Sequence, residues 1–198
     1  MFSWIQQINE SLLLSLNSLS TNDNIAMIVW IFADAPIFFI PIFLIITWII
    51  LSYKREQEKK ENLLFILYSC ILGIVIALLI QKIVHFDRPE NYILHTWKLL
   101  LKHIPDASFP SDHATVSFAF LTSLLLSNYK KVFYIFLPFA FIMVISRIIA
   151  WVHWPLDIIV WILIWIFSSL ITFKFIKKLE IIKKLNTMIM KIASFVKL

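Results

Sequence analysis

Glycine and cysteine are nearly absent from this chain of 198 residues, which contains one of each. With a single glycine the chain has no glycine-rich phosphate loop, which excludes both a P-loop and a Rossmann dinucleotide site. With a single cysteine, Cys70, it has no internal disulfide and no metal site built from several cysteines. Cys70 lies within an apolar run, so we interpret it as a residue that packs in the core or faces lipid.

Charged residues are scarce as well: they make up 15% of the chain, whereas 61% of its residues are hydrophobic and its mean hydropathy is +0.87. A soluble domain of this length needs far more polar surface. Eighteen phenylalanines and eight tryptophans fit helices that face lipid and place aromatic rings at the membrane interface. The composition therefore predicts a membrane-embedded domain. We attribute the net charge of +6 to membrane orientation and anionic lipid rather than to nucleic acid.

Five apolar runs predict membrane-spanning helices, since a helix needs about 20 residues to cross the hydrocarbon core and only the third run is clearly shorter. They are residues 25–52, 63–84, 113–127, 132–150 and 156–176. Residues 1–22 mix apolar and polar side chains near helical spacing, which predicts an amphipathic helix at the interface. We therefore expect an all-α, polytopic membrane bundle of about five transmembrane helices plus this interfacial helix. It forms one domain over residues 1–198, with its transmembrane core at 25–176.

Most of the eighteen lysines and arginines fall on one side of such a bundle, including the lysines of the tail at residues 177–198. The positive-inside rule places that side in the cytoplasm. The loop at 85–112 and the turn at 151–155 then face outward. The tail forms a basic amphipathic segment on the inner leaflet, and the C-terminus is cytoplasmic.

All three polar stretches of the chain fall at the predicted outer ends of helices, and the last of them carries groups suited to attack on a phosphate. They are Ser146, Arg147, His153 and Asp157. If the segment from His153 is helical, a spacing of four residues puts the imidazole and the Asp157 carboxylate on one face. A carboxylate beside a histidine fixes its tautomer and stabilises its charged form. Each residue alone also has a structural interpretation: Arg147 can snorkel, Asp157 can cap a helix, and His153 can be an interfacial aromatic.

The middle polar stretch, residues 108–113, precedes the third apolar run. Ser111 is a natural N-cap for the helix that follows, which is its structural interpretation. The same position has a functional use, because the free N–H groups and the dipole at a helix start bind an anion. His113 in the first turn either donates a proton to a leaving oxygen or is an ordinary interfacial residue.

The first polar stretch ends the second apolar run with Lys82 and Arg88. Arginine offers a planar fork that suits phosphate oxygens, and lysine offers a point charge. Two structural interpretations stay open: Lys82 can snorkel to the interface, and Arg88 can pair with Asp87 or Glu90 beside it.

Asp34 lies inside the first apolar run, where a charge is costly. It either faces the functional site or pairs with a basic group, or it caps a helix whose first turn contains Pro36. The sequence leaves these interpretations open.

Taken together, the three stretches resemble the signature of the type 2 phosphatidic acid phosphatase superfamily: a lysine followed by Arg-Pro, then Pro-Ser-x-His, then Ser-Arg-x5-His-x3-Asp. The last block matches in full over residues 146–157. The middle block matches over residues 110–113, with Asp112 where many members have glycine. The run Ser-Phe-Pro-Ser-Asp-His resembles the branch of bacterial undecaprenyl-diphosphatases that is associated with bacitracin resistance.

The first block departs from the family pattern. The family usually has six residues between the lysine and the arginine, whereas Lys82 and Arg88 have five, and Gln81 occupies the usual lysine position. One residue corresponds to about 100° around a helix, so Gln81 and Lys82 face different directions. The match therefore leaves open whether Lys82 contacts the phosphate.

The resemblance implies that His153 attacks phosphorus and forms a phosphohistidine, that Asp157 orients His153, and that His113 protonates the leaving group. The phosphate oxygens are then held by Arg88, Arg147, Ser111, Ser146 and Lys82. Such a mechanism needs no cofactor and no metal. A divalent cation at Asp112 is an option that the sequence does not support, because the few acidic groups lie beside basic ones and form no convincing ligand set.

The function implied by the resemblance is hydrolysis of undecaprenyl diphosphate to undecaprenyl phosphate and inorganic phosphate, which recycles the lipid carrier of cell-wall synthesis. The site then lies on the extracytoplasmic face of a bacterial inner membrane, and the partners are a polyprenyl diphosphate lipid and the bilayer. No nucleic acid is expected, and the sequence leaves the oligomeric state open.

Two alternatives accompany this interpretation. One is a phosphatase or phosphotransferase that acts on another lipid, such as phosphatidylglycerophosphate or lipid A. The other is a non-catalytic binder or transporter of lipid phosphates, which needs the two arginines of the blocks. Such a binder has no need of both His113 and His153, so their joint presence with Asp157 favours an enzyme.

Overall fold

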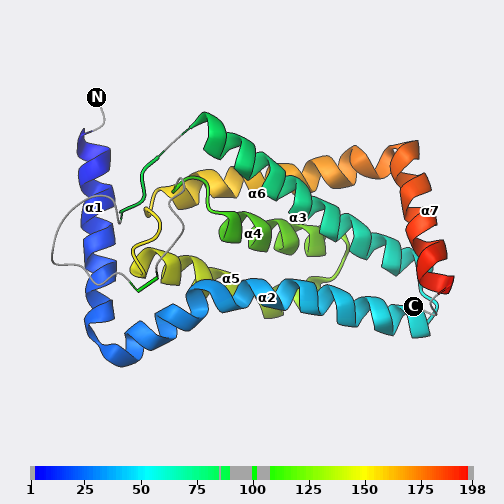
Figure 1. Cartoon of the computed structure of the whole chain (residues 1–198), viewed down its shortest axis with the longest axis horizontal. Coiled ribbons are helices and arrows are strands. Elements are labelled where there is room, and N and C mark those ends of the chain that lie inside the picture. The colour runs from blue at the N-terminus through cyan, green and yellow to red at the C-terminus, as the bar shows by residue number, and fades with distance from the viewer. Residues whose placement is uncertain (1–2, 85, 90–99, 102–107, 196–198) are drawn as a thin grey trace.

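The computed structural model describes residues 3–84, 86–89, 100–101 and 108–195, and within these ranges every regular element is a helix (Figure 1). In chain order they are α1 (Ser3–Asn17), the 3-10 turn η1 (Ser18–Thr21), α2 (Asp23–Tyr53), α3 (Gln57–Ile83), α4 (Asp112–Leu126), α5 (Lys130–Ile149), α6 (Asp157–Lys174), the 3-10 turn η3 (Ile176–Lys178) and α7 (Glu180–Phe195). This confirms the all-α prediction. The predicted apolar runs correspond to α2 through α6, with ends that differ by a few residues.

α4 occupies the centre of the bundle that α2 through α6 form (Figure 1). It packs against α3, α5 and α6 and also contacts α2. Nine of its fifteen residues are buried, among them Ala119 and Leu124. A helix shorter than a full membrane span is stable in this place because its neighbours, rather than lipid, surround most of it.

The single glycine of the chain lies where α3 meets α4 and α6. A Cβ atom at Gly73 would lie 3.1 Å from Cγ2 of Thr115 and 3.4 Å from Oγ of Ser168. Small residues at such positions let helix backbones approach closely in membrane bundles. Gly73 therefore permits the tight contact of α3 with the central helix.

Long apolar helices form the outside of the bundle. Among the described residues, α2, α3 and α5 are each long and apolar enough to cross a membrane. Their outward faces expose large apolar side chains, for example Phe38 at 63%, Leu79 at 55% and Ile135 at 61%. Exposed apolar surface on this scale is unfavourable in water and matches a lipid environment. The chain is therefore a membrane protein.

α1 lies across one end of the bundle and supports the turn between α5 and α6 (Figure 1). Leu13 packs in a cluster with Trp151 and Trp154 of that turn. The side-chain amide of Asn17 donates a hydrogen bond to the backbone oxygen of Ile149 at 2.7 Å. The helix predicted for the N-terminus thus has a structural task in addition to its amphipathic character.

α7 lies across the opposite end of the bundle (Figure 1). It is attached to the first half of α3, because Tyr68 Oη donates to Asn186 Oδ1 at 2.7 Å and Asn186 Nδ2 donates to Glu61 Oε1 at 3.2 Å. Apolar side chains such as Ile181 and Phe195 remain exposed. The two ends of the bundle therefore each carry an amphipathic helix, one beside the polar stretches and one remote from them.

Candidate active site

The polar stretches predicted from the sequence meet at the end of the bundle that α1 covers. Two hydrogen bonds join the first stretch to the last. Trp154 Nε1 donates to the backbone oxygen of Asp87 at 2.9 Å, and Arg88 Nη1 donates to the backbone oxygen of Val152 at 3.1 Å. Residues that are more than sixty positions apart in sequence thus form one local structure.

His153 is buried in the turn between α5 and α6, with only 1% of its surface exposed. Its Nδ1 lies 2.8 Å from the backbone oxygen of Ser108, and its Nε2 lies 3.3 Å from Nη2 of Arg147. A carbonyl oxygen only accepts and a guanidinium only donates, so these contacts assign the proton of the neutral ring to Nδ1. The lone pair then lies on Nε2, the nitrogen that contacts Arg147.

Asp157 lies near His153, but not through helical spacing, because the segment from His153 to Leu156 is not helical. α6 begins at Asp157 and the residues before it form turns, because Pro155 disfavours helical backbone at the preceding residue. Asp157 Oδ2 lies 3.9 Å from His153 Nδ1. It accepts hydrogen bonds from Ser108 Oγ at 2.8 Å and from the backbone N–H of Trp154 at 3.0 Å. The carboxylate therefore holds Ser108, whose carbonyl in turn holds His153.

Ser108 is a candidate site residue that the sequence analysis did not assign. It is fully buried and contacts both His153 and Asp157, through its carbonyl and its hydroxyl respectively. The sequence feature that could have indicated Ser108 is its place at the start of the motif Ser-Phe-Pro-Ser-Asp-His.

Arg147 is held inside the bundle, with 2% of its surface exposed, so it does not snorkel to the interface. Its Nη1 donates to Oδ1 of Asp34 at 2.5 Å and to the backbone oxygen of Ala33 at 3.3 Å. Ser146, which precedes it in the last turn of α5, is buried as well. Arg147 therefore connects the last sequence block to α2.

Asp34 lies in the interior of α2, which runs unbroken through Pro36. The N-cap of this helix is Asn22, whose side chain accepts two backbone N–H groups, so Asp34 has no capping role. Its Oδ1 lies 3.3 Å from Nε2 of His113 in addition to its contact with Arg147. Of the interpretations left open by the sequence, the structure supports pairing with basic groups.

Ser111 is the N-cap residue of α4, yet its side chain makes no capping hydrogen bond. Only 1% of its surface is exposed, and within the described residues its Oγ has no hydrogen-bond partner. A buried hydroxyl without a partner is unfavourable, so its presence requires an explanation. An anion at this helix N-terminus would accept a hydrogen bond from Oγ and from backbone N–H groups of the first turn.

Gln81 and Lys82 face different surroundings at the end of α3. Gln81 Nε2 donates to the backbone oxygen of Pro110 at 2.9 Å and to Oδ1 of Asp112 at 3.1 Å. Lys82 is exposed. The residue at the family's usual lysine position therefore contacts the middle block, and the phosphate contact of Lys82 stays a prediction.

Arg88 and Arg147 bring two guanidinium groups to the same buried region. They are 5% and 2% exposed, and they contact neighbouring residues of one turn, since Arg88 donates to the backbone oxygen of Val152 and Arg147 contacts His153. Two cations that are removed from water repel each other unless anions lie near them. Asp34 offsets part of the charge of Arg147. A phosphate group would offset the charge of both arginines and would match the planar geometry of their donors.

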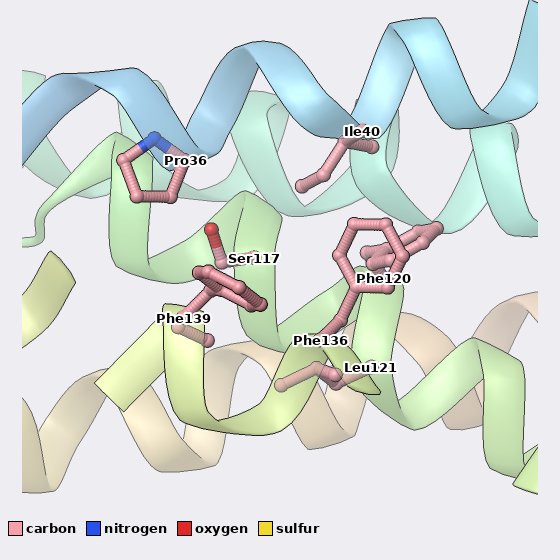
Figure 2. Close-up of a pocket in the computed structure, with 8 residues that line it drawn as sticks. Pro36, Ile40, Ser117, Phe120, Leu121, Phe136 and Phe139 are labelled. Atoms are coloured by element: carbon pink, nitrogen blue, oxygen red, sulfur yellow. The ribbon is translucent and has the colours of Figure 1, made fainter. Parts of the chain in front are cut away.

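A small apolar recess lies where α2 meets α4 and α5, and it begins two residues beyond Asp34 (Figure 2). It is lined by Pro36, Ile40, Ser117, Phe120, Leu121, Phe136, Phe139 and Ala140. Its volume of about 10 Å³ has room for roughly one water molecule. The recess is too small to hold a lipid chain.

Comparison with known proteins identifies a family and two similar proteins from Bacillus species. The model of the PAP2 superfamily matches residues 62–181. The bacitracin transport permease protein BcrC of Bacillus licheniformis is 29% identical over 168 residues, which are 83% of this chain and 78% of that protein. The undecaprenyl-diphosphatase BcrC of Bacillus subtilis is 31% identical over 120 residues, which are 61% of each chain.

The crystal structure of Aquifex aeolicus LpxE is similar to this chain with a TM-score of 0.65. It is 23% identical in sequence, and the match covers 85% of this chain and 96% of that one, so the likeness shows a common fold. The region matched by the family, residues 62–181, contains all three sequence blocks, including the buried His153 of the last block. Because sequence, fold and site agree in this way, the chain belongs to the PAP2 superfamily and is a membrane phosphatase.

Proposed function

We propose that this protein hydrolyses undecaprenyl diphosphate to undecaprenyl phosphate and inorganic phosphate through a phosphohistidine on His153. The proposal is carried by the two contacts of the His153 ring, where the Ser108 carbonyl accepts from Nδ1 and Nε2 faces Arg147. A nucleophilic imidazole needs this tautomer, with its lone pair on the nitrogen that faces a phosphate-binding cation. Relatives from Bacillus subtilis and Sulfolobus acidocaldarius are named undecaprenyl-diphosphatase, which supports this substrate over other lipid phosphates.

In the first step, Nε2 of His153 attacks the terminal phosphorus, and the bond from that phosphorus to the bridging oxygen breaks. His113 donates a proton to the leaving oxygen of undecaprenyl phosphate. Arg88, Arg147 and Ser111 bind the oxygens of the transferred group and offset the charge that develops on them. The buried and unpartnered Oγ of Ser111 supports this role, as judged over the described residues.

In the second step, water attacks the phosphohistidine, the bond between phosphorus and Nε2 breaks, and inorganic phosphate leaves. His113, which lost its proton in the first step, accepts one from the attacking water. Ser146 and Lys82 complete the phosphate-binding set that we propose. None of these steps requires a cofactor.

We infer that the protein is a multi-pass protein of a bacterial inner membrane, with its active site on the extracytoplasmic face. The support is the separation of the two bundle ends, since the site lies beside α1 and the lysines of α7 lie at the far end (Figure 1). By the positive-inside rule the α7 end is cytoplasmic. The polyprenyl chain of the substrate then stays in the bilayer against the apolar outer surface while its diphosphate reaches His153.

The first test is release of inorganic phosphate from undecaprenyl diphosphate in detergent, with the wild type compared with His153→Ala. We expect the rate to fall by a factor of about 1,000 or more, because removing a nucleophile abolishes the covalent route. Thermal melting of both proteins establishes that the variant is folded. Release that persists in the folded variant would contradict the phosphohistidine mechanism.

The same assay separates the alternative functions. A folded wild type that releases no phosphate from undecaprenyl diphosphate, but does so from phosphatidylglycerophosphate or lipid A, would replace the proposed substrate. Phosphate that appears on a second lipid instead of in solution would identify a phosphotransferase.

A further inference from the structure

We propose that Asp34 is a positioning residue for catalysis, which holds the predicted acid His113 and the predicted phosphate ligand Arg147 in a fixed relation. This inference rests on the proposed function. α2, which carries Asp34, contributes no residue to the three sequence blocks. The role is therefore additional to the residues of the family signature.

One carboxylate oxygen connects two other helices of the bundle. Oδ1 of Asp34 accepts from Nη1 of Arg147, on α5, at 2.5 Å and lies 3.3 Å from Nε2 of His113, on α4. Arg147 extends the connection, because its Nη2 lies 3.3 Å from Nε2 of His153. The carboxylate is thus linked directly to the predicted acid and, through one guanidinium, to the predicted nucleophile.

The contact with His113 also defines where a proton lies. An ionised carboxylate only accepts, so Nε2 of His113 carries a proton where it faces Asp34. The side chains of His113 and Asp34 are 27% and 35% exposed, so a leaving oxygen can reach them without opening the core. Asp34 therefore holds a protonated nitrogen at an accessible position, as general acid catalysis requires.

A purely structural role for Asp34 accounts for less of the geometry. Neutralising the buried Arg147 needs a contact with Arg147 alone. The backbone oxygen of Ala33 already accepts from the same Nη1, at 3.3 Å, so α2 holds the guanidinium through its backbone as well. A carboxylate within an apolar helix is energetically unfavourable. A catalytic role through the contact with His113 explains why it is present.

Two substrates that differ only in their leaving group test this role. Phenolate is a poorer leaving group than p-nitrophenolate, so hydrolysis of phenyl phosphate depends more strongly on a general acid than hydrolysis of p-nitrophenyl phosphate. We expect Asp34→Asn to lower kcat for phenyl phosphate by about 10- to 100-fold. For p-nitrophenyl phosphate we expect a loss of about threefold or less, with KM changing less than kcat for phenyl phosphate.

The variant His113→Ala should show the same order of losses on the two substrates. Asp34→Asn keeps a side-chain oxygen that can accept from Arg147, so the selective loss is assigned to His113, and adding Asp34→Asn to His113→Ala should cause little further loss for phenyl phosphate. Equal losses on both substrates for Asp34→Asn would overturn the inference. So would losses that multiply in the double variant.

Control variants separate this effect from general damage to the fold. Asp23→Asn removes a carboxylate from the first turn of the same helix and should leave both rates unchanged. If Asp34→Asn does not fold, Asp34→Glu retains the charge, and a loss selective for phenyl phosphate supports the role whereas equal losses overturn it. Wild-type turnover of the aryl phosphates without release from undecaprenyl diphosphate would reject the proposed substrate and leave this test intact.

Discussion

The imidazole of His153 is fixed at both ring nitrogens by groups that do not themselves react. The Ser108 carbonyl accepts from Nδ1, and Arg147, which Asp34 holds, contacts Nε2. Asp157 stands one step further away, because it binds the hydroxyl of Ser108 more closely than it approaches the ring. Two carboxylates are thus connected to the same histidine through one residue each, Asp157 through Ser108 and Asp34 through Arg147. These connections keep both ring nitrogens in defined roles.

Ser108→Ala tests whether Asp157 acts on His153 through this serine. The substitution removes the hydroxyl that donates to Asp157 and keeps the carbonyl that accepts from His153. A hydrogen bond to a charged group is worth about 1.5–3 kcal/mol, so we expect kcat to fall by about 10- to 100-fold. KM should change little, because we assign Ser108 no contact with the phosphate.

Ser69→Ala is the matched control, since Ser69 is equally buried but donates only within its own helix, to the backbone oxygen of Phe65. Its kcat should stay near that of the wild type. Full activity of Ser108→Ala would instead mean that Asp157 orients the histidine directly, despite the distance of 3.9 Å between their atoms.

These contacts explain why the sequence predicted candidate site residues but not how those residues meet. The blocks have fixed spacings, so Arg147, His153 and Asp157 were evident from the sequence. The Ser108 carbonyl and the Asp34 carboxylate are 45 and 113 residues from their partners His153 and Arg147. Such contacts depend on how helices pack, and a spacing rule cannot report them.

At the scale of whole helices, prediction from the sequence was more complete. An apolar run indicates a helix directly, so α2 through α6 lie close to their expected positions, although α3 begins at Gln57 rather than at residue 63. Among the described helices, α2, α3 and α5 are long and apolar enough to cross a membrane. The central place of α4 was not predictable from its composition. The position of α4 depends on its packing against α2, α3, α5 and α6, and on the close approach of α3 at Gly73.

Gly73→Leu tests that close approach. Even the first carbon of the new side chain would lie 3.1 Å from Thr115 Cγ2, so α3 and α4 must separate or shift. Overpacking of a core typically costs about 1–3 kcal/mol, and we expect a loss of stability of at least that size. Thermal unfolding in detergent measures it, with Val75→Leu on the exposed face of α3 as the control that should change little. Equal melting temperatures for Gly73→Leu and the wild type would contradict this account of the packing.

The whole molecule has two dissimilar ends. Beside α1 lie the buried arginines and histidine of the site, and across the other end lies α7 with its lysines (Figure 1). An enzyme that acts on a lipid head group needs its site at one surface of the bilayer. By the positive-inside rule, the lysines at the α7 end predict that the site faces the opposite, extracytoplasmic surface.

Labelling of single introduced cysteines in spheroplasts with a membrane-impermeant maleimide tests this orientation. Thr21→Cys introduces an exposed thiol at the α1 end, and Glu180→Cys introduces one at the start of α7, where the side chain of Glu180 is 75% exposed. The native Cys70 is buried and gives a low background. We expect Thr21→Cys to react in intact spheroplasts and Glu180→Cys to react only after lysis. The reverse pattern would place His153 on the cytoplasmic side and would contradict the inferred orientation.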